Sequence, residues 1–320
     1  MTGGNGHEPT RFIITVDTET YKVGGRFPRF EDNLYGDLPE GSFGVPKIME
    51  ICEKHGAKAT FFVDVYMHRH YGMQKVEELC RRIKERGHDV QLHAHMSWVP
   101  EAHTSDLCAL PLDDQVKVLA EGKECIRHAI GEAPVAFRAG AYAANLDSIE
   151  AMKRTGFLLD SSYFAFYPSC PLSRQLGNKY GNRSFQIGGM REIPVTTFWL
   201  MNQPFCRKIS KTDINSASLA EMCDAIPQML QRRLRYVVLF LHSFSFIRWK
   251  RDFSGIVPNH RAVQRFEKLL QRIAQWEPAS EFCTMEQVSR QPAAPEEETD
   301  FIPTVSSFRL FPRLYQRFVE

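Results

Sequence analysis

The sequence alternates between short apolar runs and longer segments in which apolar residues recur every three or four positions. The first apolar run covers residues 11–19, and a segment with one apolar helical face follows at 44–56. A second run at 58–65 and a second helical segment at 75–87 repeat this order. The apolar helical positions are Val45, Ile48, Met49 and Cys52 in the first segment and Val76, Leu79, Cys80 and Ile83 in the second. The pattern predicts strands that alternate with single amphipathic helices.

The alternation continues through the middle of the chain. We expect strands at 88–95 and 134–140 and helices at 113–131 and 146–156. Each of the four helices ends at a glycine, a residue that readily adopts the left-handed conformation of a helix C-terminus. These residues are Gly56, Gly87, Gly131 and Gly156.

The same order resumes after residue 190. The expected strands are 191–200, 236–244 and 281–288, and the expected helices are 219–235 and 261–276. Strands joined by single crossover helices pair in parallel. About seven or eight such units favour a distorted, closed or nearly closed (β/α) barrel. The alternative is an open doubly wound sheet, but no glycine-rich phosphate-binding motif follows the first strand.

Composition narrows the class of protein. With 320 residues, 43% hydrophobic and 24% charged, the chain can form one large domain or two small ones. Its net charge of +2 gives no electrostatic reason to expect nucleic acid binding. The eight cysteines form no CxxC pair, which suggests core residues in a reducing compartment. We expect a cytoplasmic protein, because neither a signal peptide nor an apolar stretch of about 20 residues is evident.

Polar side chains gather at the ends of the expected strands, where a barrel places its chemistry. They are Asp17, Glu19, His93, His95, Arg138, Asp160 and His242. Residues two apart on a strand share a face, so Asp17 projects with Glu19, and His93 with His95. Two acids and two imidazoles at one rim predict a metal site with ligands suited to zinc.

Each of these residues also has a purely structural interpretation. Arg138 could neutralise a buried acid, and Asp160 could cap the turn formed by its own two serines. A single histidine such as His242 is often a hydrogen-bonded edge residue. The occurrence of all these groups at strand ends of one β/α chain favours a shared site.

Six motifs, in this order, resemble the polysaccharide deacetylases, the carbohydrate esterases that share the NodB homology domain. They are TVDTE, GAKATFFV, GHDVQLHAH, FRAGAY, LDSSY and LFLHS. The resemblance covers roughly residues 11–290, and KATFFV followed by RGHDVQLH is its most specific part. It implies a distorted (β/α) barrel that removes N- or O-acetyl groups from sugars with zinc or another divalent metal.

The resemblance implies a role for five catalytic residues of this chain. Asp17 matches the catalytic base, and Arg138 would orient it. The backbone N–H of Tyr142 would stabilise the oxyanion of the tetrahedral intermediate. His242 matches the general acid, and Asp160 would hold a histidine in its charged, oriented form.

The metal ligands depart from the usual pattern of the family. His93 matches the first metal-binding histidine, and Glu19 replaces an aspartate expected one residue earlier. The position of the usual second histidine holds Ser97 instead, so His95 is the candidate that completes the set. The loop that follows offers His103 as a further candidate ligand.

The substrate implied by the resemblance is an acetylated sugar, either free, nucleotide-linked, lipid-linked or polymeric. Two other classes stay open: a non-catalytic carbohydrate-binding protein on this scaffold, and an amidohydrolase that acts on a non-sugar C–N bond. Long loops at 21–43 and 164–190 are candidate binding elements. Aromatic residues that could stack on a sugar or simply pack the loops are Trp98, Phe164, Phe166, Tyr167 and Tyr180.

The two ends of the chain differ from the barrel region at 11–290. Residues 1–10 read as a flexible N-terminus, 291–302 as a linker rich in proline and acids, and 303–320 as an amphipathic tail. The tail would either pack onto the barrel or lie at a membrane surface, with arginines on anionic headgroups. Its apolar face comprises Phe311, Leu314, Tyr315 and Phe318, and its arginines are Arg309, Arg313 and Arg317.

Overall fold

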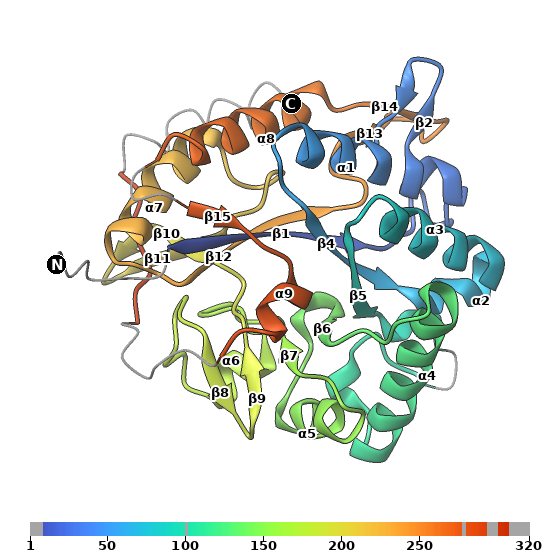
Figure 1. Ribbon diagram of the computed structural model, residues 1–320, viewed down its shortest axis with the longest axis horizontal. Coiled ribbons are helices and arrows are strands. Elements are labelled where there is room, and N and C mark those ends of the chain that lie inside the picture. The colour runs from blue at the N-terminus through green and yellow to red at the C-terminus, as the bar shows by residue number, and fades with distance from the viewer. Residues whose placement is uncertain (1–8, 100–101, 277–279, 293–299, 307–320) are drawn as a thin grey trace, which may run out of the picture.

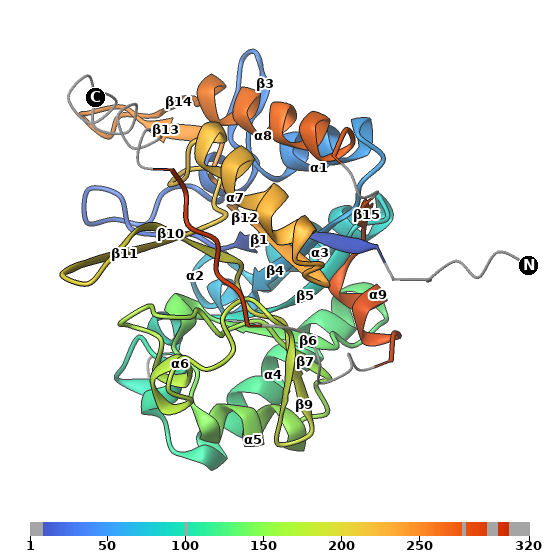
Figure 2. The same ribbon diagram turned by 90° about the vertical axis from the view of Figure 1, so that its left-hand side faces the viewer.

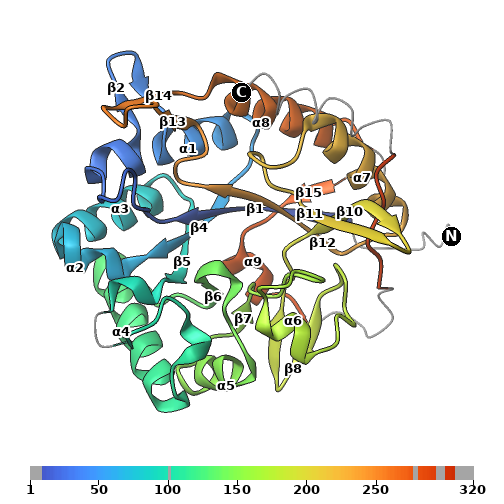
Figure 3. The ribbon, with the colours of Figure 1, turned by 180° about the vertical axis from the view of Figure 1, so that it is seen from behind.

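The computed structural model describes residues 9–99, 102–276, 280–292 and 300–306. A curled, mostly parallel sheet lies at its centre, in the order β12-β1-β4-β5-β6-β7-β9-β8, and β15 also pairs with β1. Helices surround this sheet, as Figures 1 and 3 show from opposite sides. The expected distorted (β/α) barrel is therefore confirmed. The strands are β1 (Thr10–Thr18), β4 (Ala59–Asp64), β5 (Asp89–Ala94), β6 (Ala136–Ala139), β7 (Leu159–Asp160), β8 (Phe185–Ile187), β9 (Met190–Glu192), β12 (Tyr236–His242) and β15 (Ser280–Phe282).

The helices follow the predicted periodicity. The four glycines that were expected to end helices all have positive φ angles, between 66° and 76°. The predicted apolar positions of the first two long helices are buried in the core. The helices are α1 (Val45–Lys54), α2 (His68–Tyr71), α3 (Met73–Glu85), α4 (Leu112–Ile130), α5 (Leu146–Arg154), α6 (Pro171–Gln175), α7 (Leu219–Gln231), α8 (His260–Ile273) and α9 (Met285–Ser289).

An irregular pair of segments nearly closes the barrel between β7 and β12. The N–H of Ile193 donates to the carbonyl of Asp160 at 2.8 Å, next to β7. The N–H of Thr212 donates to the carbonyl of Thr196 at 3.0 Å, and the N–H of Phe240 on β12 donates to the carbonyl of Thr212 at 2.9 Å. Residues around 193–197 and 212–214 thus fill the gap that regular strands leave.

Two predicted strands are wrong in part. The strand expected at 191–200 is divided between β9 and β10 (Thr197–Gln203), with Pro194 between them, which has no N–H for a ladder. The strand expected at 281–288 ends at Phe282, and α9 follows. Thr284 begins this helix, because its hydroxyl accepts from the N–H of Gln287 while the Gln287 side chain accepts from the N–H of Thr284.

Three hairpins extend from the barrel and shape its surroundings. The hairpin of β10 and β11 (Cys206–Lys211) projects from the body of the protein in Figure 2. The hairpins β2–β3 (Asp37–Leu38 and Gly41–Ser42) and β13–β14 (Ile247–Trp249 and Ile256–Pro258) lie together at one edge in Figures 1 and 3. The two long loops expected at 21–43 and 164–190 contain short helices and strands of their own.

The remaining expectations concern cysteines, membrane spans and the chain ends. All eight cysteines are free, and Cys52, Cys80, Cys170 and Cys283 are buried, as expected of core residues. Within the described residues, no helix combines the length and apolar character that crossing a membrane requires. Residues 303–306 run along β10, where the N–H of Trp199 donates to the carbonyl of Pro303 at 2.8 Å. The rest of the predicted tail, 307–320, lies outside the described residues, as do 1–8 and most of the predicted linker.

Candidate active site

The register of the parallel strands brings the predicted polar residues to one rim. Asp17 on β1 is paired with His242 on β12. On the other side of β1, the neighbouring strands β4 and β5 pair Asp64 with His93, and β6 then pairs Arg138 with His93. Because these residues all lie at the carboxyl ends of their strands, their side chains meet above the same end of the barrel.

Glu19, His93 and His95 form a compact cluster at this rim. Their ligand atoms all lie within 4.8 Å of one another. The Oε2 atom of Glu19 lies 3.1 Å from Nε2 of His93 and 2.5 Å from Nε2 of His95. The backbone is still extended at His95, with φ −105° and ψ 123°, so both histidines project to the same face. The structure thus brings together the three residues predicted as metal ligands.

Second contacts fix the orientation of both imidazoles. The Nδ1–H of His93 donates to the carbonyl oxygen of Arg138 at 2.9 Å, which leaves Nε2 directed at Glu19. The ring of His95 lies against Gly140, where a Cβ atom would come within 2.5 Å of Nδ1. A side chain at position 140 would therefore displace the His95 ring.

Charge binds the cluster together in the metal-free state. Burial raises the pKa of Glu19, but His95 and His93 together lower it by more than burial raises it. The net pKa is therefore well below its usual value. Burial lowers the pKa of His95, whereas the adjacent Glu19 raises it to about 9. A cation at this position is therefore favoured by the carboxylate, whether it is a protonated imidazole or a bound metal ion.

Asp64 is an acid of this site that the sequence analysis missed. Its side chain is fully buried, Oδ1 accepts from the N–H of Tyr66 at 3.3 Å, and Oδ2 has no hydrogen-bond partner among the described residues. Burial raises its pKa to about 7, and the charges of His95 and His93 act on it in the opposite direction. Its position at the end of strand β4 was a usable signal, but it stood in an apolar run that suggested only core.

Asp17 and Arg138 form a buried ion pair beside the cluster. Nη1 of Arg138 donates to Oδ1 of Asp17 at 2.8 Å and to Oγ1 of Thr15 at 3.0 Å. The guanidinium also donates to the carbonyl and to the hydroxyl of Ser161, at 3.0 and 2.9 Å. Burial raises the pKa of Asp17, but the charges of Arg138, His93 and His242 together outweigh it, and the net pKa is lowered. Asp17 is therefore held as a carboxylate in a fixed orientation.

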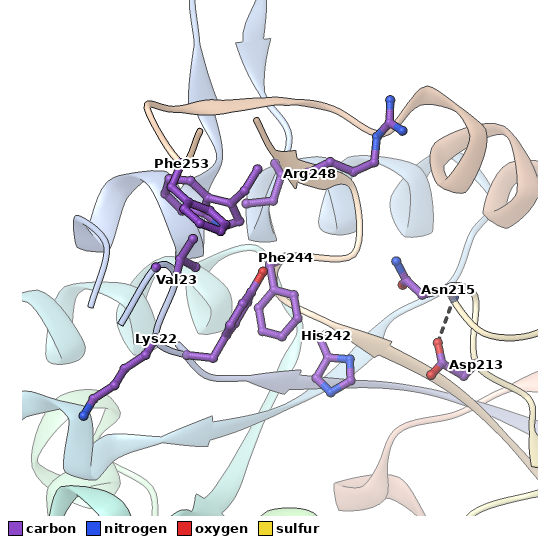
Figure 4. Close-up of a pocket in the computed structure, with 12 residues that line it drawn as sticks. Lys22, Val23, Asp213, Asn215, His242, Phe244, Arg248 and Phe253 are labelled. Carbon is purple, nitrogen blue, oxygen red and sulfur yellow. Dashed lines mark hydrogen bonds between the residues drawn. The ribbon is translucent and has the colours of Figure 1, made fainter. Parts of the chain in front are cut away.

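His242 stands on the opposite side of Glu19 from the other two histidines. Its Nε2 atom lies 3.6 Å from Oε1 of Glu19, and its ring stacks on Phe244 with centroids 4.8 Å apart. Burial lowers its pKa, and the carboxylate of Glu19 opposes that change. The imidazole faces a cavity of about 710 Å³, drawn in Figure 4.

Tyr142 lies in a strained turn directly after β6. Ala141 and Tyr142 have φ angles of 52° and 60°, in the left-handed region that residues other than glycine rarely adopt. The phenol oxygen of Tyr142 accepts a hydrogen bond from Nζ of Lys211 at 2.6 Å. This turn is the segment whose backbone was expected to supply the oxyanion contact.

Asp160 has other neighbours than the histidine expected as its partner. Asp160 lies on β7 in register with Glu192 on β9, and burial raises the pKa of both carboxyl groups. It also accepts from the hydroxyl of Ser162 at 2.6 Å, as the structural interpretation expected. Among the described residues, no histidine forms a hydrogen bond or ion pair with it. The reason is that β7 pairs with β9, which turns the Asp160 side chain toward an acid.

A second acid missed by the sequence analysis, Asp213, lies near His242 instead. Both residues line the same cavity, and Asp213 accepts from the N–H of Asn215 at 2.8 Å (Figure 4). Nζ of Lys211 lies 3.5 Å from Oδ2 of Asp213 and 3.1 Å from the centre of the Phe240 ring. The sequence analysis missed Asp213 because this residue follows the β10–β11 hairpin rather than a regular barrel strand.

Most of the aromatic residues proposed as sugar contacts pack against one another. Phe164 and Tyr167 stack at 4.5 Å, Tyr180 stacks on Phe185 at 3.7 Å, and Trp98 lies 4.3 Å from Phe27. The aromatic rings that face the cavity beside His242 belong to other residues, Tyr21, Phe244, Trp249 and Phe253. His103 is exposed and is not part of the metal-ligand cluster.

Comparison with known proteins agrees with this fold. Residues 30–159 match the polysaccharide deacetylase family. No curated protein matches the chain.

Solved structures show the same fold at low sequence identity. A Mycobacterium smegmatis protein assigned to the polysaccharide deacetylases has 17% identity and a TM-score of 0.53, over 90% of this chain and 96% of that one. A protein from Pseudomonas aeruginosa PAO1 with the same assignment has 13% identity and a TM-score of 0.56, over 88% and 89% of the two chains. The 4-alpha-glucanotransferase of Thermococcus litoralis reaches 0.55 at 13% identity, over 89% of this chain and 41% of that one. Since a transferase shares the fold, the reaction has to be argued from the site.

Proposed function

We propose that the protein is a metal-dependent hydrolase that removes an acetyl or similar acyl group from an amino sugar of a polysaccharide or glycolipid precursor. The observation that carries this proposal is the cluster of Glu19, His93 and His95 beside the buried Asp17–Arg138 pair. The match of residues 30–159 to the polysaccharide deacetylases supports the acyl–sugar chemistry. The cluster supports the metal dependence.

The donor set fits a divalent metal ion, and zinc in particular. Two imidazole nitrogens and one carboxylate are common zinc ligands in catalytic sites. Because Nδ1 of His93 donates to a carbonyl, its Nε2 atom can offer a lone pair toward Glu19. The partnerless Oδ2 atom of Asp64 adds a buried acid near these ligands. When bound, a divalent ion would polarise the acyl carbonyl and make water more acidic.

The other residues of the rim supply a base and an acid. Asp17, kept ionised by Arg138, accepts the proton of the attacking water. His242 lies across Glu19 from the histidine pair and donates a proton to the departing sugar amine, which is a poor leaving group without it. The N–H of Tyr142, in the turn after β6, hydrogen-bonds the oxyanion that forms on the acyl carbon. The aromatic cavity beside His242 offers ring faces to the C–H groups of a pyranose.

Metal analysis combined with acetate release tests this proposal. Glu19→Gln, His93→Ala and His95→Ala should each lose bound metal and activity on acetylated amino sugars. Asp17→Asn should keep the metal and lose turnover, because an amide cannot accept the proton. Ser97→Ala is a matched control, since Ser97 occupies the family's usual second histidine position but is exposed and outside the cluster.

Three results would contradict the proposal in different ways. Full metal content in both histidine variants would exclude the cluster as the metal site. Sugar binding without acetate release by the metal-loaded protein would support a non-catalytic binding protein. Release of acyl groups from simple amides but not from amino sugars would support an amidohydrolase of another substrate class.

A further inference from the structure

A second cavity, of about 740 Å³, lies next to the aromatic cavity that His242 faces. Its walls come from the β13–β14 hairpin, the first turns of α8 and the loop before α7. Three residues, Asn215, Ile247 and Arg248, line both cavities. The two spaces are therefore neighbours along one surface, and the Arg248 side chain points away from the aromatic rings toward the start of α8 (Figure 4).

The second cavity is strongly basic. Its lining residues include four arginines and a histidine but no carboxylate. We name these residues the arginine pocket: Arg248, Arg251, His260, Arg261 and Arg265. The nearby acid Asp252 is engaged by its own loop, because the hydroxyl and the N–H of Ser254 donate to it at 2.8 and 3.1 Å. The positive charge of the pocket is thus not cancelled from within.

Several arginines elsewhere on the surface have an acidic partner. Arg81, Arg82 and Arg154 each pair with a glutamate one turn away on their own helix. In the arginine pocket, by contrast, Arg248 and Arg251 are exposed and form no ion pair or hydrogen bond through their side chains among the described residues. A group of like charges without acids is unfavourable in the free protein, and it attracts anions.

The pocket is also held in shape. Nη1 of Arg265 donates to the carbonyls of Ile214 and Asn215, at 2.5 and 3.5 Å. This contact ties α8 to the loop that follows β11 and carries Asn215, which lines both cavities. The side chain of Asn259 caps the first turn of α8 through the N–H of Ala262 at 3.3 Å, and the positive end of this 14-residue helix adds to the basic field.

We infer that the arginine pocket binds a phosphoryl or pyrophosphoryl group attached to the sugar substrate. Planar guanidinium groups match the geometry of phosphate oxygens and often bind them in pairs. Four arginines exceed what one carboxylate would require and suit a group with two or more negative charges. A sugar in the aromatic cavity, with its acylamino group toward His242, can direct a phosphate ester toward Arg248. The inference rests on the proposed function and names its substrate class: an acylated amino sugar linked through phosphate or diphosphate to a nucleotide or a lipid.

Binding of inorganic pyrophosphate tests the pocket without requiring turnover. Calorimetry at low salt should detect binding by the wild type, and binding should weaken as the salt concentration rises. The Arg248→Gln/Arg251→Gln variant should lose affinity by about tenfold or more, since each charge-assisted hydrogen bond contributes that much. The Arg272→Gln variant changes an exposed arginine in the last turn of the same helix and should bind like the wild type.

Pyrophosphate also binds metal ions, so the measurement needs a background without the metal site. Glu19→Gln provides it, and pyrophosphate should bind this variant with wild-type affinity. If binding disappears with Glu19→Gln but persists without Arg248 and Arg251, the metal site is the receptor and the inference is wrong. Equal losses in the pocket variant and in Arg272→Gln would show a diffuse charge effect and would also overturn it.

Hydrolysis assays then separate the two sources of the phosphate. UDP-N-acetylglucosamine represents the nucleotide-linked class, farnesyl-diphosphate-linked N-acetylglucosamine the lipid-linked class, and N-acetylglucosamine oligomers the neutral class. The pocket variant should raise KM for one phosphorylated class by about tenfold or more beyond any change for the neutral class. An equal change for all three classes would overturn the inference while leaving the proposed function intact. Arginine-dependent pyrophosphate binding without any acyl release would contradict the proposed function and leave the pocket as a phosphate-binding site.

Discussion

Replacing Arg138 by methionine is the substitution for which the structure gives the clearest energetic expectation. The guanidinium is fully buried and donates to Thr15, Asp17 and Ser161. Methionine fills a similar volume but donates no hydrogen bond. The substitution therefore leaves the carboxylate of Asp17 buried beside acids and without its counter-cation.

The expected loss of stability is about 3–5 kcal/mol at neutral pH, as for other buried ion pairs that lose one partner. The pH dependence has a definite sign. In the wild type the pKa of Asp17 is lowered, so the ion pair stabilises the fold above pH 3.8, the ordinary pKa, and this contribution fades as the pH falls through the lowered pKa. In the variant, burial and Glu19 still raise the pKa of Asp17, and only His93 and His242 oppose them. The difference between the two proteins should therefore shrink under acid conditions.

Urea unfolding of metal-free protein, followed at several pH values, measures this difference. Asp17→Asn in the Arg138→Met background should recover about 2 kcal/mol, because the stranded charge is removed. Arg154→Met changes an exposed arginine paired with Glu150 and should cost less than about 1 kcal/mol. The reasoning is refuted if Arg138→Met costs no more than this control, or if Asp17→Asn adds to the loss instead of reducing it.

Three further outcomes follow from the charges and the cavity of the site. Metal-free protein should lose stability between pH 6.5 and 9 as His95, whose pKa Glu19 raises to about 9, deprotonates, and thermal unfolding with and without zinc should show the loss only without metal. Lys211→Met removes a cation that lowers the pKa of His242, so the alkaline limb of the pH–rate profile should move to higher pH. Lys208 is exposed on the same strand, and Lys208→Met should leave the alkaline limb in place. Phe253→Ala, which removes a 55% exposed ring from the cavity, should raise KM for the sugar without changing the melting temperature.

Periodicity predicted the barrel because strand and helix repeats follow directly from backbone geometry. The same geometry predicted that His93 and His95 share a face and that both lie near Glu19. It did not predict the partner of Asp160, since nothing in an isolated strand reveals that β9 would pair beside it. Asp64 was overlooked for a similar reason, because an acid at the end of an apolar strand has no local sign of its orphaned oxygen.

Local sequence chemistry explains the two misassigned strands. Pro194 removes an N–H from the segment expected as one strand, so the chain leaves the sheet there and re-enters a different hairpin. Thr284 and Gln287 form a helix-capping pair within a run whose apolar alternation suggested a strand. A missing N–H in the first case and a capping pair in the second outweighed the hydrophobic pattern, and these residues were visible in the sequence.

Residues at the strand ends and residues in the loops give different information about the reaction and the substrate. The proposed acid, base and metal ligands lie at or just beyond the ends of regular strands, whose positions the barrel fixes. The aromatic cavity and the arginine pocket are formed largely by loops and by the β13–β14 hairpin. The aromatic residues proposed from the loops stack mostly on neighbours within those loops, as Tyr180 does on Phe185 and Phe164 on Tyr167. Reaction type can therefore be argued from strand-end residues, while the substrate has to be argued from which loop residues face His242. That is why variants of Arg248 and Phe253, rather than of the metal cluster, are the ones that should discriminate among acylated sugars.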